Sequence, residues 1–464
     1  MGRMINCISL LAALILSLVL TGQPAEVAAV NTAPEQDEGK IISLLVTLMR
    51  PNVQNDAILR HLDSTWTEGY IPPLLDVLYL SEASPANRRA IVRLLERKTG
   101  QRHGPNINAW LEWVWNREEQ TLPFQGDWMA RIYKGIDPRF GRYFTGRTES
   151  SLIRLDEVRW GGVKQDGIPP LRQPKMLNAT TADYLNDNNV VFGISINGDH
   201  RAYPKRILAW HEMFVDEIGG EPIAGVYCTL CGTVIAYNTE FGGYNYNLGT
   251  SGFLYRSNKL MYDRATQSLW NTIEGKPVIG PLAGNGIELE SHAVVTTTWG
   301  EWRALHPDTK VLSLETGHRR DYGEGVAYRS YFATDNLMFN VPQLDGRLAN
   351  KDEVLIVRAE DYQDDPLAIS ARYLKRNRVY QDKIGSTDFV VLTDKSGGNR
   401  VYSAGDNSFT KLRDGKLLDK NGVGWAVSEE RLVAPTGEAL ERLPYHRIFW
   451  FAWFNTYPET RLVR

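Results

Sequence analysis

The spacing of apolar residues divides the chain into a helical N-terminal part and a longer β-rich part. From Lys40 to about Glu119, apolar residues recur at the interval that places them on one face of a helix. Residues 41–48 form the first such segment, and Pro51 ends it. Segments of the same kind cover residues 57–62, 71–80 and 90–98, with Pro, Gly and Ser between them. We therefore expect residues 30–119 to form a small array of short helices.

From Val190 onward the pattern is mainly that of β-strands. Residues 190–196 predict a strand, and Asn197-Gly198 predicts a hairpin turn after it. One short helix is expected near residues 206–210, and the strands that follow place Cys228 and Cys231 on a turn between two of them. Residues 120–189 contain many turn signals and are expected to form a connector that wraps the β-rich part.

Two segments of the β-rich part match two later segments, which indicates an internal duplication. Residues 202–219 align with residues 368–385, and residues 299–309 align with residues 450–460. We therefore predict an α+β fold, in which an N-terminal α-helical (HEAT-like) region precedes two tandem related β-rich units. The units are expected at residues 190–314 and 354–464, with a linker at residues 315–353.

The two predicted units differ in their chemically reactive residues. Residues that both units share are best explained as scaffold, whereas residues found in one unit only are candidates for function. In the second unit, Asn377, Arg378, Asp394 and Gly397 replace four residues of the first, namely His211, Glu212, Cys228 and Cys231. The second unit is therefore expected to be degenerate and kept for structure. A segment without counterpart in the second unit adds three further candidates, Ser251, Asp263 and Arg264.

The N-terminus has the order of a secretory signal. A basic start at Arg3 precedes a mostly apolar run over residues 5–20, and the small residues Ala28 and Ala29 fit a cleavage site, so residues 1–29 are expected to be a signal peptide. The apolar run is shorter than the roughly 20 residues of a spanning helix. We expect an exported protein, periplasmic or secreted, with no membrane span in the mature chain. The formal net charge of -3 gives no basic face for nucleic acid.

Several spaced motifs over about residues 150–464 together resemble the DUF3179 family, whose members have no established function. The motifs are Trp160-Gly161-Gly162-Val163, Asp166-Gly167-Ile168-Pro169, His211-Glu212, Tyr227-Cys228-Thr229-Leu230-Cys231-Gly232, Met261-Tyr262-Asp263-Arg264 and His306-Pro307-Asp308-Thr309. Thr229 stands where the family commonly has Pro, which loosens the turn slightly and removes no ligand. The resemblance implies bacterial export and a β-rich fold, and it implies no activity.

The two cysteines of the first unit suggest a metal site. Two thiolates separated by two residues can bind one metal ion, and Gly232 permits the tight turn that this needs. Since no second cysteine pair exists, His211 is the best third ligand, and Asp263 or Met261 would be the fourth. A set with Asp suits zinc, and a set with Met suits copper(I). Zinc or copper is therefore the expected cofactor, with Glu212 and Arg264 beside it.

Two alternatives remain open for the same cysteines. The protein can be a periplasmic thiol-disulfide oxidoreductase, although the residues after Cys231 predict a strand and not the helix that lowers a thiol pKa in thioredoxin-like proteins. It can also be a non-catalytic interaction protein with a structural disulfide, whose helical region recruits a protein partner. Glu212, Arg264 and Ser251 are the catalytic candidates if the protein is an enzyme. No phosphate-binding glycine loop is present, so no nucleotide cofactor is expected.

Overall fold

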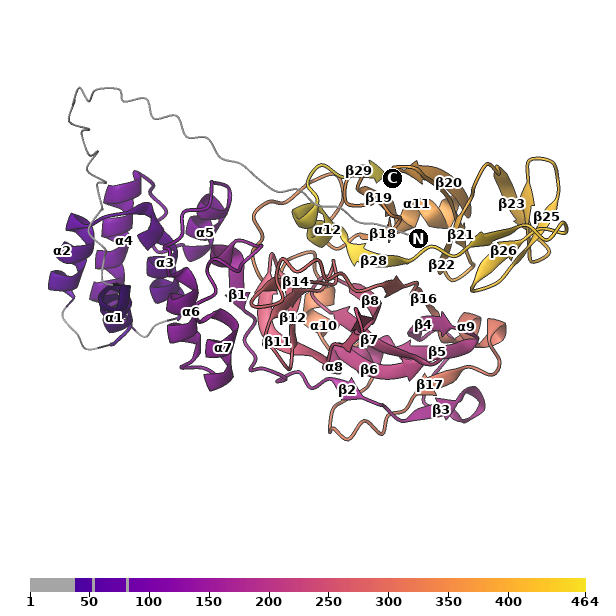
Figure 1. The fold of residues 1–464 in the computed structure, drawn as a ribbon, viewed down its shortest axis with the longest axis horizontal. Coiled ribbons are helices and arrows are strands. Elements are labelled where there is room, and N and C mark those ends of the chain that lie inside the picture. The colour runs from indigo at the N-terminus through magenta and orange to yellow at the C-terminus, as the bar shows by residue number, and fades with distance from the viewer. Residues whose placement is uncertain (1–37, 52–54, 81–82) are drawn as a thin grey trace, which may run out of the picture.

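The structure is a computed structural model that describes residues 38–51, 55–80 and 83–464. The predicted signal peptide, residues 1–29, lies outside these described residues. Helices dominate the N-terminal part and strands the remainder, so the fold is α+β as predicted (Figure 1). In the described part of the chain, no helix combines the length and the apolar character that crossing a membrane requires.

The N-terminal helices pack around one apolar core. The helices are α1 (Glu38–Leu48), α2 (Asp56–Ser64), α3 (Ile71–Leu80), α4 (Pro85–Thr99), α5 (Ile107–Trp115), α6 (Gln125–Tyr133) and α7 (Gly141–Phe144). The helices predicted at residues 41–48, 57–62, 71–80 and 90–98 are therefore confirmed. Ser84 caps α4 by accepting a hydrogen bond from the Asn87 amide, and Gly100 ends it in the left-handed conformation.

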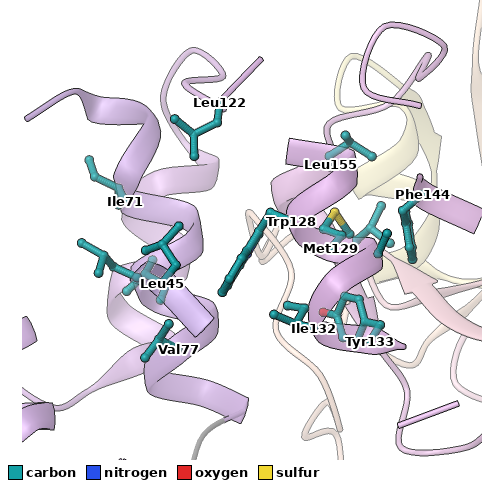
Figure 2. Packing of buried hydrophobic residues seen from close by; sticks show 14 of the residues in the cluster. Leu45, Ile71, Val77, Leu122, Trp128, Met129, Ile132, Tyr133, Phe144 and Leu155 are labelled. Atoms are coloured by element: carbon teal, nitrogen blue, oxygen red, sulfur yellow. The ribbon is translucent and has the colours of Figure 1, made fainter. Parts of the chain in front are cut away.

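The helical part extends further than the sequence predicted, because α6 and α7 lie in the expected connector. Trp128 extends from α6 toward α3 (Figure 2). Its ring nitrogen donates a hydrogen bond to the Asp76 carboxylate at 3.0 Å. The core that these helices share continues into the first β-sheet through Phe253 and Tyr262. The helices and the first sheet are therefore joined by a common apolar core.

Three five-stranded sheets follow the helices. The first has the order β1 (Val158–Trp160), β11 (Leu248–Tyr255), β12 (Asn258–Asp263), β13 (Leu269–Asn271), β14 (Lys276–Ile279). The second has the order β15 (Ser291–His292), β8 (Thr233–Asn238), β7 (Glu221–Cys228), β6 (Met213–Ile218), β2 (Leu171–Arg172). The third has the order β16 (Val295–Thr298), β4 (Val190–Ile196), β5 (Asp199–Pro204), β17 (Lys310–Leu312), β3 (Met176–Asn178). Between them run α8 (Lys205–His211), α9 (Trp299–Leu305) and the hairpin of β9 (Glu240–Phe241) and β10 (Tyr244–Asn245).

Three further sheets form the C-terminal part. The first of these has the order β28 (Tyr445–Phe449), β18 (Glu353–Val357), β19 (Leu367–Ser370), β29 (Arg461–Val463). The second has the order β20 (Val379–Ile384), β21 (Thr387–Thr393), β22 (Asn399–Ser403). The third has the order β23 (Phe409–Arg413), β24 (Lys416–Asp419), β25 (Gly424–Val427), β26 (Arg431–Val433), β27 (Ala439–Glu441). The helices here are α10 (Arg329–Phe332), α11 (Ala371–Arg376) and α12 (Trp450–Thr456). The predicted strand at residues 190–196 is β4, and the helix predicted near residues 206–210 is α8.

Four strands of the third sheet have the same order and the same relative directions as the four strands of the first C-terminal sheet. In β16-β4-β5-β17 and in β28-β18-β19-β29, the first two pairings are antiparallel and the last is parallel. In α9, which precedes β17, the buried Trp302 donates a hydrogen bond to the Thr309 hydroxyl at 2.9 Å. In α12, which precedes β29, the buried Trp453 donates a hydrogen bond to the Thr460 hydroxyl at 2.8 Å. These two sheets therefore share one local architecture.

Candidate functional site

Cys228 and Cys231 form a disulfide, with their Cα atoms 5.4 Å apart. Cys228 is the last residue of β7 and β8 begins at Thr233, so the strand–turn–strand setting predicted from the sequence is confirmed. Gly232 has a φ of 65° and lies under the Phe449 ring, where an added Cβ would meet that ring at 2.6 Å. Only glycine allows both the turn and this close contact.

The disulfide turn is held by three other segments of the chain. The Phe449 amide donates to the Cys231 carbonyl at 2.7 Å, and the Tyr331 hydroxyl donates to the Leu230 carbonyl at 2.7 Å. The Cys231 sulfur lies 3.7 Å from the Ser257 carbonyl oxygen. The exposed fractions of Cys228 and Cys231 are 1% and 0%. The disulfide is therefore buried where β28, α10 and the β11–β12 turn meet.

Cys228 nevertheless lines a small cavity of about 60 Å³. Much of the wall is apolar and includes Val163, Ile168, Phe253, Leu254, Met338 and Phe339. The residues with polar side chains are Glu212, Thr229, Thr250, Lys259 and Tyr328. Residues of the predicted connector, first β-rich unit and linker thus line one cavity together with Cys228.

Four of these polar side chains form one cluster around Glu212, whereas the Thr250 hydroxyl donates to the Ile168 carbonyl. The Glu212 carboxylate accepts from the Thr229 hydroxyl at 2.7 Å and from the Tyr328 hydroxyl at 2.9 Å. Lys259 Nζ lies 3.3 Å from the other carboxylate oxygen and donates to the Glu212 carbonyl at 2.8 Å. Both members of this ion pair are buried, with exposed fractions of 5% for Lys259 and 6% for Glu212.

Burial shifts the pKa values of two members of the cluster in opposite directions. Burial lowers the pKa of Lys259, and the negative charge of Glu212 opposes that effect. Burial also raises the pKa of Tyr328, and Glu212 adds to this rise. A buried amine with a lowered pKa, held beside a carboxylate and a phenol, can accept or release a proton during a reaction.

Non-glycine residues with left-handed backbone conformations gather around the cavity. Glu212 and Tyr328, which both line the cavity, have φ values of 54° and 56°. Such conformations are costly for residues with a side chain and tend to cluster at functional sites. This backbone strain marks the cavity independently of its side-chain chemistry.

His211, the predicted third metal ligand, uses both ring nitrogens in other contacts. Nδ1 lies 2.9 Å from the Pro169 carbonyl, and Nε2 lies 2.6 Å from the Tyr322 hydroxyl. Because a carbonyl can only accept, Nδ1 carries the proton and Nε2 accepts from Tyr322. Burial lowers the pKa of His211 to about 4, which keeps the ring neutral at neutral pH.

Asp263 and Met261, the candidates for a fourth ligand, are also occupied locally. The Asp263 carboxylate accepts from the amide and the hydroxyl of Thr266 at 2.7 and 2.8 Å, which closes its own turn. Met261 packs in an apolar cluster with Trp270. Among the described residues, no group of three or more His, Cys, Asp or Glu side chains is arranged to hold a metal ion. The predicted ligand set of Cys228, Cys231, His211, Asp263 and Met261 is therefore not assembled here.

Of the three catalytic candidates, Glu212 alone lines the cavity. Ser251 is buried, donates to the Leu260 carbonyl at 2.6 Å and accepts from the Phe253 amide at 3.0 Å, which stabilises β11. Arg264 is exposed on the turn after β12.

Sequence reasoning missed Lys259 and Tyr328. A lone cation within the apolar strand over residues 258–263 was the available signal for Lys259. Tyr328 lies in the segment interpreted as a linker, and nothing in the sequence connected it with the cysteines.

A family model described as "Protein of unknown function (DUF3179)" matches residues 165–460. This range includes the disulfide and all the polar residues of the cavity. No curated protein and no solved structure matches the chain.

Proposed function

The chain belongs to the DUF3179 family of proteins of unknown function, and we propose from the site itself that it catalyses thiol–disulfide exchange at Cys228 and Cys231. One observation carries this proposal: Cys228 lines the same cavity as the buried ion pair of Lys259 and Glu212. A purely structural disulfide needs no titratable groups beside it. The turn that it closes is also so short that cross-linking stabilises the fold only slightly.

The exchange proceeds in two steps. The thiolate of a small thiol attacks the Cys228 sulfur, the S–S bond breaks, and Cys231 leaves as a thiolate that then takes a proton. A second substrate thiolate attacks the mixed disulfide on its substrate sulfur, which releases Cys228 and forms the substrate disulfide. Two substrate thiols are oxidised by two electrons in total, and their two protons end on the cysteines. A second disulfide restores the cystine by the same two steps in reverse and is itself reduced to two thiols. Lys259 and Glu212 accept and deliver these protons.

The size of the cavity limits the substrate. A cavity of about 60 Å³ with a mostly apolar wall admits a small group and not a folded protein. We therefore propose a small thiol as the substrate. The attacked sulfur is that of Cys228, because Cys228 is a lining residue of the cavity and Cys231 is not.

Replacement of Lys259 tests the proposal. In a Cys7→Ser background, Lys259→Met is expected to slow the reduction of the disulfide by cysteamine by about tenfold or more, the usual scale for loss of an acid–base group. Thiol titration of the folded protein measures the rate. Lys276→Met, which changes a lysine of β14 outside the cavity, is the matched control and is expected to react like the parent.

Equal rates in Lys259→Met and the control would remove the proposed role of Lys259. If small thiols reduce the disulfide only after the protein unfolds, the disulfide is structural. That result would favour a non-catalytic interaction protein.

Zinc or copper binding at Cys228 and Cys231 stays a prediction of the sequence. It requires prior reduction of the disulfide and further ligands around the two thiolates. Metal analysis of the reduced protein separates the two functions. A stoichiometric amount of zinc or copper would favour the metal site, and a metal-free dithiol that reoxidises would favour exchange.

We also infer that residues 190–314 and 354–464 are tandem copies, the second of them degenerate. The shared strand order and the paired Trp–Thr hydrogen bonds support this inference. Gly219 and Gly385, which the duplication aligns, follow β6 and β20 with φ values of 58° and 52°. In the second unit, the turn between β21 and β22 carries Asp394 and Gly397 where the first carries its cysteines.

Export to the periplasm or the medium is part of the same proposal. Disulfides persist in oxidising compartments, so the cystine agrees with the signal peptide predicted for residues 1–29. A HEAT-like repeat in the helical region, and a protein partner bound through it, remain predictions.

A further inference from the structure

A second pocket lies between the N-terminal helices and the first β-sheet. Its volume is about 690 Å³, within the range of about 300–1,000 Å³ typical of small-molecule sites. Arg131, Lys134, Arg142 and Arg147 line it from the helical side, and Thr266 and Gln267 line it from the turn after β12. The turn is the segment that the sequence singled out as lacking a counterpart in the second unit.

The pocket carries a clear excess of positive charge. Four cationic side chains line it, whereas Asp127 is the one carboxylate in its wall. Asp127 already accepts a hydrogen bond from the Gly146 amide at 2.8 Å. Within the described residues, none of the four cations forms an ion pair with a carboxylate. Their charge is therefore free to act on a ligand.

Arg147 is the most constrained of these cations. Its guanidinium packs against Gly280, and its Nη1 is buried without a hydrogen-bond partner. Its Nη2 makes one long hydrogen bond, of 3.4 Å, to the Thr266 carbonyl. Burial lowers the pKa of Arg147, and no carboxylate opposes this effect. A partly buried charge without a counter-ion is costly, and a bound anion would offset that cost.

The local fold explains why these charges face the pocket. The residues of α6 that enter the core include Trp128, Met129, Ile132 and Tyr133 (Figure 2). Arg131 and Lys134 are exposed and line the pocket instead. On the opposite wall, the Asp263 carboxylate is directed to Thr266 of its own turn and is not among the lining residues. The pocket thus keeps more positive than negative charge in its walls.

We propose that this pocket binds a small, multiply charged anion that carries phosphate or carboxylate groups. Four cations around one pocket favour a ligand with more than one negative charge, and arginine binds phosphate and carboxylate in bidentate fashion. A hollow between two walls fits a soluble anion better than a flat membrane surface. This site is separate from the disulfide cavity and does not rest on the proposed exchange reaction.

Pyrophosphate is a direct probe of this site. Calorimetric titration of the full chain at low ionic strength is expected to give saturable binding that weakens as salt is added. The double variant Arg131→Gln/Arg142→Gln is expected to bind about tenfold or more weakly, because each guanidinium contributes charge-assisted hydrogen bonds. Both arginines are exposed, so the variant is expected to keep the parent melting temperature.

The matched control is Arg97→Gln on α4, which removes an exposed positive charge from the same helical part but outside the pocket. It is expected to bind pyrophosphate like the parent. No pyrophosphate binding by the parent at low salt would overturn the proposal, and so would equal affinities of the double variant and the control. Binding to anionic phospholipid vesicles without binding to pyrophosphate would also overturn it, since the surface would then recognise a membrane.

Discussion

At the scale of single residues, the ion pair of Lys259 and Glu212 decides what the cavity can do. A buried ammonium group is stable only when a counter-charge and hydrogen bonds surround it. Glu212 provides both, through its carboxylate at 3.3 Å and its carbonyl at 2.8 Å. The left-handed conformation of Glu212 lets one residue present both groups to the lysine. The strain at Glu212 thus has a specific consequence for the site.

His211 gives a residue-scale prediction about pH. Its pKa is about 4 in the folded chain, below its ordinary value of 6.5, because the ring is buried. Below pH 6.5 the unfolded chain takes up a proton that the folded chain resists, so the free energy of unfolding falls as the pH drops. Each unit of difference between the folded and unfolded pKa corresponds to 1.36 kcal/mol of free energy. The free energy of unfolding is therefore expected to fall by about 3 kcal/mol near pH 4 because of His211.

Urea unfolding at several pH values measures this effect. The His211→Gln variant is expected to lose this part of the pH dependence, while the contributions of other buried groups such as His446 remain. Parallel pH profiles for the parent and His211→Gln would show that the histidine titrates normally in the folded chain.

At the scale of elements, the sequence predicted those parts of the fold that depend on local pattern. The helix α3, the strand β4 and the turn that carries Cys228 follow from periodicity and turn residues over short windows. The sequence did not predict the helix α6, because the residues on both sides of it are typical of turns and residues 120–189 were interpreted as a connector. The site was predicted in part, through the two cysteines and Glu212.

Lys259 and Tyr328 could not be placed in the site from the sequence, because long-range pairing brings them there. Lys259 reaches the cavity through the antiparallel register of β12 against β11, in which it pairs with Leu254. Tyr328 reaches the cavity because the segment interpreted as a linker, residues 315–353, passes beside it. That segment has no regular spacing of apolar residues. Neither arrangement leaves a local signal.

The proposed duplication gives a prediction at the element scale. Trp302→Ala and Trp453→Ala are each expected to destabilise the protein by about 3–5 kcal/mol, the usual cost of removing a large buried aromatic side chain. Similar losses are expected because both indoles are buried and donate to a threonine.

Denaturant unfolding measures the two losses, and Trp113→Ala on α5 is the control, since Trp113 is only partly buried. A large loss for one tryptophan and a negligible loss for the other would contradict equivalent roles in two copies.

At the scale of the whole molecule, the disulfide lies at the meeting point of the two β-rich parts. β28 bonds to the Cys231 carbonyl through Phe449, and α10 bonds to the Leu230 carbonyl through Tyr331. The C-terminal part therefore supports the turn at which we propose the exchange, although it has no cysteine of its own. If the proposed duplication holds, this arrangement gives the second copy a structural role at the site of the first.

The most direct test of the proposed exchange is to trap its intermediate. In a Cys7→Ser background, Cys231→Ser leaves Cys228 as the single thiol, and Cys228→Ser leaves Cys231. After treatment of the folded proteins with cystamine, the disulfide of cysteamine, intact-mass spectrometry detects any cysteamine adduct. We predict a rapid adduct on Cys228, which lines the cavity, and little or none on Cys231, which does not. Absence of the adduct from both folded variants, with normal labelling of both after unfolding, would contradict a thiol–disulfide exchange site.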